Sequence, residues 1–292
     1  MSIARFKVDA AGKPLDPEGL KAQYRADGIV VIENLIPAEE TAKPLAEFEA
    51  AMRAALDKLG ADTAGQDVDA LYKALWRLDP AKAEVCMGLG RDLPAYYGLV
   101  SSPRLRGVMS LLLDDERHML AHDFNLFRID GKETQRGAFD WHQDYPYNVL
   151  SLDAITFWLP VRPVTAGMGG MKVVKGSHDR LRPVRIVKKE GRFNPNSLSI
   201  SVTQDEVARW ESEAVDTGPI DAGSVILFDC KLLHRSAKNE SERFRWIVNG
   251  RYGRIADDAL MARDWYTVRT KHPLYFMQAH PDLVVEESEA AE

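Results

Sequence analysis

The sequence contains little that would cross-link it or hold it in a membrane. Only two cysteines, Cys86 and Cys230, occur among its 292 residues, which is too few for a disulfide framework and typical of a reducing cytoplasm. Apolar runs such as 108–113 are far shorter than the roughly 20 residues that span a bilayer. The first ten residues lack the apolar stretch of a secretory signal. We therefore expect a soluble, cytoplasmic protein, and Cys230, which lies in an apolar run, is expected in the core.

Positive charge is also scarce. The chain has 38 lysines and arginines against 44 aspartates and glutamates, a formal net charge of −6. This balance argues against general nucleic-acid binding, which needs a basic face, but allows a local basic pocket for a small anion. Hydrophobic residues make up 45% and charged residues 28%, as in ordinary globular proteins. We expect one domain over residues 1–292 that binds small molecules; the oligomeric state is not readable.

The order of the expected elements divides this domain into parts. Apolar residues spaced three and four apart predict helices, and β-branched runs between Gly, Pro and Asp predict strands. Helices are expected from Pro17 and at about 36–59, 66–76, 101–113 and 204–212. Strands are expected near 28–33, 118–129, 153–162, 170–175, 224–228 and 244–253. The expected layout is a helical N-terminal layer (1–117), a β core (118–253) with an insertion at 180–217, and a C-terminal segment (254–292). Helices followed by strands indicate a β-sandwich or barrel with a helical buttress.

The segment Trp141-His142-Gln143-Asp144-Tyr145 contains the main candidate for chemistry. On a strand, residues two apart point to the same face, so His142 and Asp144 would project together. A second histidine, His234, follows the apolar run 223–229. Two imidazoles and one carboxylate can hold an octahedral iron and leave its other positions open. A His-x-Asp alone is common by chance, however. The other histidines have no such partners and are expected in turns, in the core or at the surface: His118, His122, His178, His272 and His280.

Residues after His234 give this set a family context. Ser236 lies two residues after it and Arg245 eleven residues after it, Gly176-Ser177-His178 reads as a turn, and Trp158 is on the strand that follows His-x-Asp. With these motifs, residues 118–253 resemble the phytanoyl-CoA dioxygenase (PhyH-like) family of Fe(II)/2-oxoglutarate-dependent oxygenases. The resemblance implies a mainly β fold with N-terminal helices, a double-stranded β-helix (jelly roll, cupin-like).

The resemblance also implies roles for individual residues. His142, Asp144 and His234 would bind Fe(II), and Arg245 with Ser236 would bind the far carboxylate of the co-substrate 2-oxoglutarate. Trp158 would wall the co-substrate pocket, and Asn125 would lie near it. A guanidinium offers paired donors that match a carboxylate. Arg243 shares strand parity with Arg245, so only the family pattern favours Arg245; Arg243 is expected in a rim ion pair with Glu240 or Glu242.

The implied reaction is hydroxylation of an unactivated C–H bond in a small polar or anionic metabolite, with dioxygen consumed and succinate and CO2 released. Desaturation and cyclisation stay open. The alternatives are a cupin-like hydrolase or isomerase using Zn(II) or another divalent metal, and a non-catalytic jelly-roll ligand-binding protein. Arg245 with Ser236 argues against a zinc hydrolase, which has no use for them.

Two further segments bear on the substrate. Residues 145–148 (Tyr-Pro-Tyr-Asn) are expected either in a loop at the pocket mouth or with both tyrosines packed under the sheet edge. Residues 180–192 are rich in arginine and lysine. They are either a basic lid that guides an anionic substrate or a solvated loop without a ligand. The sequence does not identify the substrate.

Overall fold

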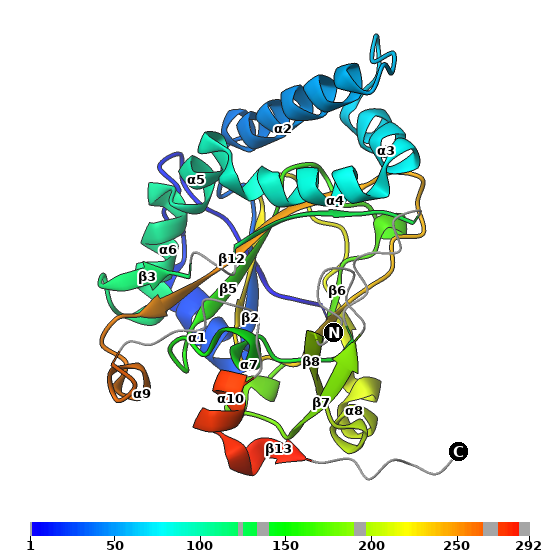
Figure 1. Ribbon diagram of the computed structural model, residues 1–292. Helices are drawn as coiled ribbons and strands as arrows, with labels where there is room; N and C mark the ends of the chain where they lie inside the picture. The colour runs from blue at the N-terminus through cyan, green and yellow to red at the C-terminus, as the bar shows by residue number, and fades with distance from the viewer. Residues whose placement is uncertain (1, 122–124, 133–139, 190–196, 265–273, 286–292) are drawn as a thin grey trace.

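The computed structural model describes residues 2–121, 125–132, 140–189, 197–264 and 274–285. His122 and His272 lie outside these ranges. Within them, a large twisted sheet is covered on one face by the N-terminal helices and on the other by two small sheets (Figure 1). Over the part of the chain described, every helix falls short of the length and apolarity needed to cross a bilayer.

The large sheet gathers strands from distant parts of the chain. Its order is β1-β2-β10-β5-β12-β3, with β4 also paired to β12. β10, β5 and β12 are antiparallel neighbours at its centre. The bounds of its strands are β1 (Arg5–Phe6), β2 (Ile29–Ile32), β3 (His118–Leu120), β4 (Leu126–Asp130), β5 (Ile155–Pro160), β10 (Val225–Asp229) and β12 (Arg245–Arg254).

Two three-stranded sheets complete the β structure of the described residues. One has the order β11-β6-β9 and the other β13-β7-β8. Their bounds are β6 (Met171–Val173), β7 (Val184–Lys189), β8 (Ser197–Val202), β9 (Val215–Asp216), β11 (His234–Ser236) and β13 (Val284–Val285). In the described ranges these sheets stay separate rather than closing into a barrel.

The period-two alternation of strands divides the core between the two faces of the large sheet. On β5, Phe157 and Leu159 belong to the cluster under the helices, whereas Trp158 packs with residues of the small sheet such as Met171. All six residues of β5 are buried, because both faces of the sheet are covered. On the face that is turned toward the small sheets, most side chains pack as an apolar core. A binding site on this face is therefore expected where polar side chains interrupt that core.

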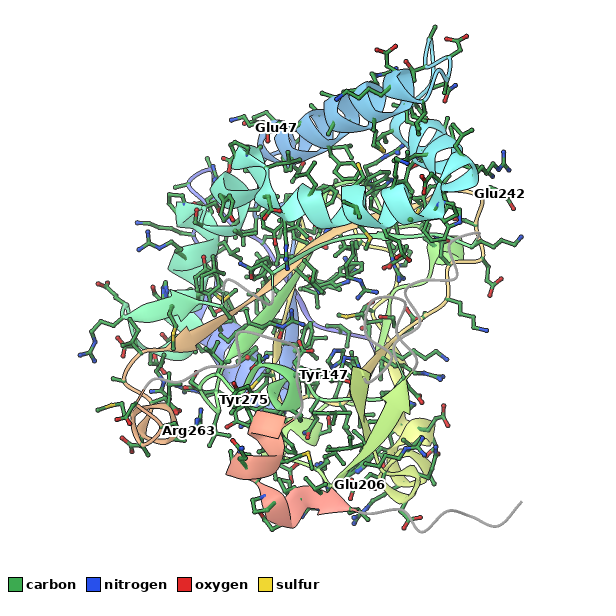
Figure 2. The ribbon with its side chains drawn as sticks, in the orientation of Figure 1. Glu47, Tyr147, Glu206, Glu242, Arg263 and Tyr275 are labelled. Atoms are coloured by element: carbon green, nitrogen blue, oxygen red, sulfur yellow. The ribbon has the colours of Figure 1, made fainter. Side chains whose placement is uncertain are left out.

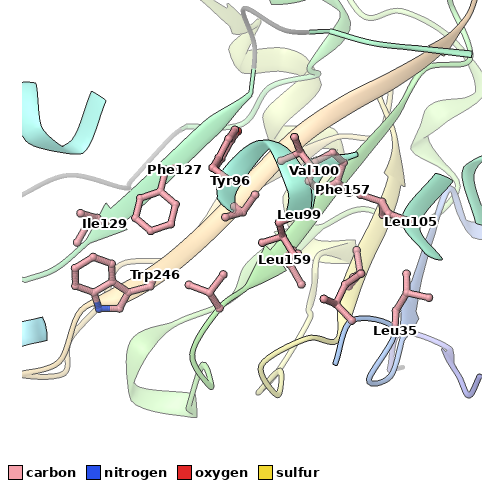
Figure 3. Packing of buried hydrophobic residues seen from close by; sticks show 14 of the residues in the cluster. Leu35, Tyr96, Leu99, Val100, Leu105, Phe127, Ile129, Phe157, Leu159 and Trp246 are labelled. Carbon is pink, nitrogen blue, oxygen red and sulfur yellow. The ribbon is translucent and has the colours of Figure 1, made fainter. Parts of the chain in front are cut away.

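The helical layer closes the other face. Its helices are α1 (Pro17–Asp27), α2 (Ala38–Lys58), α3 (Val68–Leu78), α4 (Pro80–Leu89), α5 (Pro94–Val100) and α6 (Pro103–Leu113). Figure 3 shows Phe127 of β4 between Tyr96 of α5 and Trp246 of β12; Tyr96 lies edge-on to Phe127 with ring centroids 6.4 Å apart. Four of these helices begin at a side chain that accepts a backbone N–H, which favours their start; the capping residues are Asp16, Asp67, Asp79 and Ser102.

Most predicted elements are present, but helices α4 and α5 and the short strands β1, β9 and β11 were not predicted, and three predicted segments differ in detail. The expected strand 118–129 contains two strands, β3 and β4. The insertion 180–217 carries a β7–β8 hairpin in addition to the predicted helix, α8 (Gln204–Trp210). Residues 145–148 form a single helical turn, α7 (Tyr145–Asn148), rather than a loop. The C-terminal part adds α9 (Asp258–Met261) and α10 (Leu274–Ala279).

Candidate metal centre and its cavity

Backbone pairing brings the three candidate ligands together. His142 and His234 form an isolated antiparallel bridge in which each N–H donates to the other's carbonyl, at 3.0 and 3.1 Å. Asp144 N donates to Cys230 O at 2.8 Å, next to the end of β10. The start of β11 is thereby tied to the His-x-Asp segment, although the two are far apart in the chain. The imidazole ring centroids of His142 and His234 lie 4.2 Å apart.

The side chains converge on one point. One ligand atom each of His142, Asp144 and His234 lies within 4.8 Å of the others. Asp144 Oδ1 is 3.7 Å from His142 Nε2 and 3.9 Å from His234 Nε2. The Nδ1 atoms face the backbone carbonyls of Asp140 and Leu232, at 2.7 and 3.0 Å. Because a carbonyl only accepts, each Nδ1 carries the proton and each Nε2 offers a lone pair to a metal.

The electrostatics favour the protonation states that a cation requires. Burial and the charge of His234 lower the pKa of His142 to about 3, and burial lowers the pKa of His234. Burial alone would raise the pKa of Asp144, but the charge of Arg251 and those of the two histidines outweigh it and hold that pKa well below its usual value. At neutral pH the set is two neutral imidazoles and one carboxylate, ready to bind a divalent ion without losing protons.

These ligands open onto a cavity between the large sheet and the small sheets. Its walls combine apolar side chains with two arginines and three uncharged polar groups. The lining residues are Leu126, Arg128, His142, Asp144, Tyr147, Trp158, Met171, Phe228, His234, Ser236, Asn249 and Arg251. Trp158 and Ser236, both proposed from the sequence as co-substrate contacts, are therefore on the same wall as the candidate ligands.

The two tyrosines of α7 lie in different places. Tyr147 lines the cavity, and its hydroxyl donates to Ile200 O of β8. Figure 2 shows Tyr147 between the large sheet and the β7–β8 hairpin. Tyr145 is fully buried, with its hydroxyl 3.2 Å from His280 Nε2. Tyr147 therefore lies at the cavity and Tyr145 in the interior, so neither alternative drawn from the sequence holds for both tyrosines.

Arg245 is placed behind the cavity wall. Its side chain is 2% exposed and it is not among the described residues that line the cavity. Its Nη2 donates to Asp130 Oδ2 at 3.0 Å. Its Nη1 faces four backbone carbonyls at 2.7–3.4 Å, those of Met168, Gly169, Gly170 and Ala237. Gly169 reaches this position with a φ of 66°, in the region that favours glycine.

Arg128 connects this buried pair to the cavity. It lines the cavity wall, and its Nη2 lies 3.0 Å from the same Asp130 Oδ2 that binds Arg245. Burial would raise the pKa of Asp130, but the charges of Arg128 and Arg245 lower it overall. Asp130 therefore stays ionised between the two guanidinium groups.

Asn125 and Arg243 are also placed away from the cavity. Asn125 is buried beside Gly250, on the side of the sheet that carries Phe157, and is not among the described lining residues. Arg243 is half-exposed and pairs through Nε with Asp69 Oδ2 at 3.4 Å. The rim ion pair expected for Arg243 was thus assigned the wrong partner, because Asp69 is contributed by the helical layer.

Residues 180–192 were considered as a basic lid that guides an anionic substrate. At least one arginine of this segment is buried and bound within the protein. Arg182 is 1% exposed, and its Nη2 donates to Ser177 O and to Asp179. Its guanidinium also lies 5.2 Å from the centre of the Trp210 ring. Arg182 therefore anchors the hairpin to α8 and does not face a ligand. Residues 190–196, including Arg192, lie outside the described ranges.

Three residues of the site were not predicted from the sequence: Arg128, Thr156 and Arg251. A partial signal existed, because Arg251 shares strand parity with Arg245 and so faces the same side of β12. Parity does not identify the partner of a buried arginine. That depends on which residues of neighbouring strands lie opposite it.

Comparisons with known proteins agree with this architecture. The family described as Phytanoyl-CoA dioxygenase (PhyH) matches residues 24–247, which confirms the predicted resemblance and extends it into the N-terminal helices. L-proline trans-4-hydroxylase of Streptomyces griseoviridis is 26% identical over 175 residues, covering 54% of this chain and 63% of that protein. Ectoine dioxygenase of Sphingopyxis alaskensis is 25% identical over 236 residues, covering 75% and 69%. The chain thus spans somewhat less than two thirds of the proline hydroxylase.

Solved structures share the fold at lower identity. The iron-bound structure of EctD from S. alaskensis has a TM-score of 0.53 and 19% identity, covering 87% of this chain and 84% of that one. The epimerase SnoN, in complex with Fe3+ and alpha ketoglutarate, has a TM-score of 0.54 and 18% identity, covering 82% and 83%. These likenesses confirm the jelly-roll fold predicted from the sequence.

Proposed function

Because the chain belongs to the phytanoyl-CoA dioxygenase family, we propose that it is an iron(II)- and 2-oxoglutarate-dependent dioxygenase. The observation that carries the proposal is the convergence of His142, Asp144 and His234 within 4.8 Å. Two neutral imidazoles and a carboxylate fit Fe(II) and leave the rest of its coordination sphere open. When bound, the iron supplies the chemistry that couples 2-oxoglutarate decarboxylation to dioxygen activation, with succinate and CO2 as products.

The protein's part in this reaction is orientation and exclusion of water. The carbonyls of Asp140 and Leu232 fix the two imidazoles so that both Nε2 atoms face Asp144 Oδ1. The apolar lining, which includes Leu126 and Phe228, limits the water that can reach the metal. The two imidazoles and the Asp144 carboxylate are thus already oriented before the substrate binds.

We place the far carboxylate of 2-oxoglutarate at the end of the cavity formed by Ser236 and Arg128. Both residues line the cavity. Arg245 belongs to the same end, because it donates to the carbonyl of Ala237, next to Ser236, and to Asp130, which Arg128 shares. In this arrangement Arg128 contacts the carboxylate, while Arg245 supports it through Asp130. Trp158 walls the pocket, and Asn125 has no direct contact.

The proposed substrate is a small polar or anionic metabolite. The relatives named above act on L-proline and ectoine by their names, and a third, 28% identical over 100 residues, is a 1-deoxypentalenic acid 11-beta-hydroxylase from Streptomyces exfoliatus. In this chain, apolar walls stand beside the polar ends of Arg251 and Asn249. Such a lining suits a compact molecule with a hydrocarbon part and a charged or polar group. Hydroxylation of a C–H bond is the proposed outcome.

The test is succinate formation with a panel of small amino and carboxylic acids, under Fe(II), 2-oxoglutarate and oxygen. We expect one or more compounds to stimulate succinate release in the wild type. His142→Ala, Asp144→Ala and His234→Ala should each abolish it, whereas His118→Ala, at the edge of the large sheet, serves as the matched control. Wild-type activity with Zn(II) but not Fe(II), and without 2-oxoglutarate, would instead identify a hydrolase or isomerase.

A further inference from the structure

The two oxygens of the Asp144 carboxylate have different surroundings. Oδ2 accepts three hydrogen bonds: from Thr156 Oγ1 at 2.7 Å, from Arg251 Nε at 3.1 Å and from Arg251 Nη2 at 2.9 Å. Oδ1 faces the Nε2 atoms of His142 and His234 at 3.7 and 3.9 Å. The carboxylate is thus divided into one oxygen bound by the protein and one directed at the metal position.

The sheet builds this division. Arg251 on β12 lies directly opposite Thr156 on β5 in the antiparallel register, so their side chains project to the same face and meet. Asp144 is held against them by its own N–H, which donates to Cys230 O. Thr156, Arg251 and Asp144 are all buried. The contact is therefore fixed by three separate strand or turn backbones and not by one flexible side chain.

The Nε–H and Nη2–H groups of Arg251 converge on one carboxylate oxygen, and each forms a charge-assisted hydrogen bond, stronger than one between neutral groups. The hydroxyl of Thr156 adds a third donor to Oδ2. A carboxylate oxygen with these donors has little capacity left for a cation. Without them, both oxygens of Asp144 could bind one metal ion together and would occupy a further coordination position.

We propose that Arg251 is a positioning residue that restricts Asp144 to coordination through Oδ1 alone. The remaining coordination positions of the metal then stay available for 2-oxoglutarate and dioxygen. The inference rests on the proposed function for the identity of the metal and of these co-substrates. It assigns to Arg251 no contact with the reacting atoms. A plain structural ion pair is the competing explanation, and it predicts no change in the coordination number of the metal when Arg251 is replaced.

The experiment counts water molecules on Mn(II) bound to the metal-free protein, by pulsed EPR in H2O and D2O. The variants are Arg251→Gln, Arg251→Lys and Thr156→Val. Arg254→Gln is the matched control, because Arg254 lies on the same strand and pairs with Asp153 at the surface. We expect Arg251→Gln to bind Mn(II) with about one water fewer than the wild type, since Oδ2 takes that position. Arg254→Gln should equal the wild type.

The other variants separate charge from geometry. Arg251→Lys keeps the charge but not the paired donors, so its water count should fall between those of the wild type and Arg251→Gln. Thr156→Val, which removes one donor and leaves the arginine, should keep the wild-type count with a weaker hold on Oδ2. An unchanged count in folded Arg251→Gln overturns the proposal. If Arg251→Gln does not fold, a wild-type count in Arg251→Lys overturns it.

The number of water molecules on Mn(II) tests the positioning role of Arg251 separately from the proposed function. This measurement requires neither turnover nor 2-oxoglutarate. A lower count in Arg251→Gln, in a protein that never forms succinate, would support the positioning role and contradict the dioxygenase activity. An active dioxygenase whose Arg251→Gln variant keeps the wild-type count would do the reverse.

Discussion

Strand β12 carries two buried arginines on one face, and each is bound to an aspartate in a different way. Arg251 binds one oxygen of Asp144 and leaves the other directed at two imidazoles. Arg245 binds Asp130, which Arg128 also binds, and its Nη1 donates to backbone carbonyls. The first pair leaves Asp144 Oδ1 directed at the metal position. In the second pair both arginines contact Asp130 Oδ2, and the pair holds Arg128 at the cavity wall.

The difference shows that a buried arginine–carboxylate pair has no fixed role. Such a pair is expensive to desolvate and is weak evidence for stability by itself. What matters is the group that the pair leaves facing the cavity: a carboxylate oxygen beside Arg251, and a second guanidinium beside Arg245. In the proposed function, the two ends of β12 support a cation site at Asp144 and an anion site at Arg128 of β4.

The largest expected effect is on stability, and it separates buried Arg245 from Arg254, a partly exposed arginine of the same strand. Arg245→Ala removes a partner of buried Asp130 and five backbone or carboxylate contacts. Breaking a buried pair in this way costs about 3–5 kcal/mol, measured as the free energy of unfolding in urea. Arg254→Ala, whose side chain is 40% exposed, should cost at most about 1 kcal/mol. Equal losses in both would show that Arg245 is not a structural support.

A smaller effect, on the affinity for 2-oxoglutarate, should show whether Arg128 or Arg245 contacts the co-substrate carboxylate. Arg128→Gln should weaken 2-oxoglutarate binding to the Fe(II) protein by roughly ten- to a hundred-fold, because one hydrogen bond to a charged group contributes about 1.5–3 kcal/mol. Metal affinity should not change. Isothermal titration under argon measures both, with half-exposed Arg243→Gln as the control. An unchanged affinity in Arg128→Gln, together with a loss in Arg245→Lys, would return the carboxylate contact to Arg245.

The smallest expected effect is a pH dependence at the Asp130 end. The pKa of Asp130 is lowered from 3.8, since the charges of Arg128 and Arg245 outweigh the opposing effect of burial. Its ionised form therefore stabilises the fold above pH 3.8, and this contribution is lost as the pH falls below 3.8 toward the lower folded-state pKa. Asp130→Asn should unfold with a shallower acid dependence between about pH 5 and pH 3. Urea titrations across that range measure the slope, and identical slopes would contradict the account.

The sequence was sufficient to predict the candidate metal ligands that the structure brings together, but not the residues that support them. His142 and Asp144 could be predicted because residues two apart share a face on extended backbone, and His234 because it follows an apolar strand. Arg251 could not be assigned, because its partner depends on the register that places it opposite Thr156. Asp130 was missed for the same reason, since it lies opposite Arg245 only in the assembled sheet.

Local conformation explains the split outcome for the tyrosines. The sequence suggested one location for both Tyr145 and Tyr147, either a loop at the pocket mouth or packing under the sheet edge. They lie instead on α7, where residues two apart point in different directions. Tyr145 is therefore buried and Tyr147 lines the cavity. The helical layer was more predictable, because its apolar stripes repeat at three and four residues over long segments.

The central claim is that His142, Asp144 and His234 hold an iron that binds 2-oxoglutarate. The most direct test is an anaerobic titration of the Fe(II)-loaded protein with 2-oxoglutarate, followed by the visible charge-transfer absorption of the chelate. The account predicts a saturable band in the wild type and none in His234→Ala or Asp144→Ala. A wild-type protein that binds one Fe(II) but develops no band, or an Asp144→Ala variant that develops the full band, would contradict it.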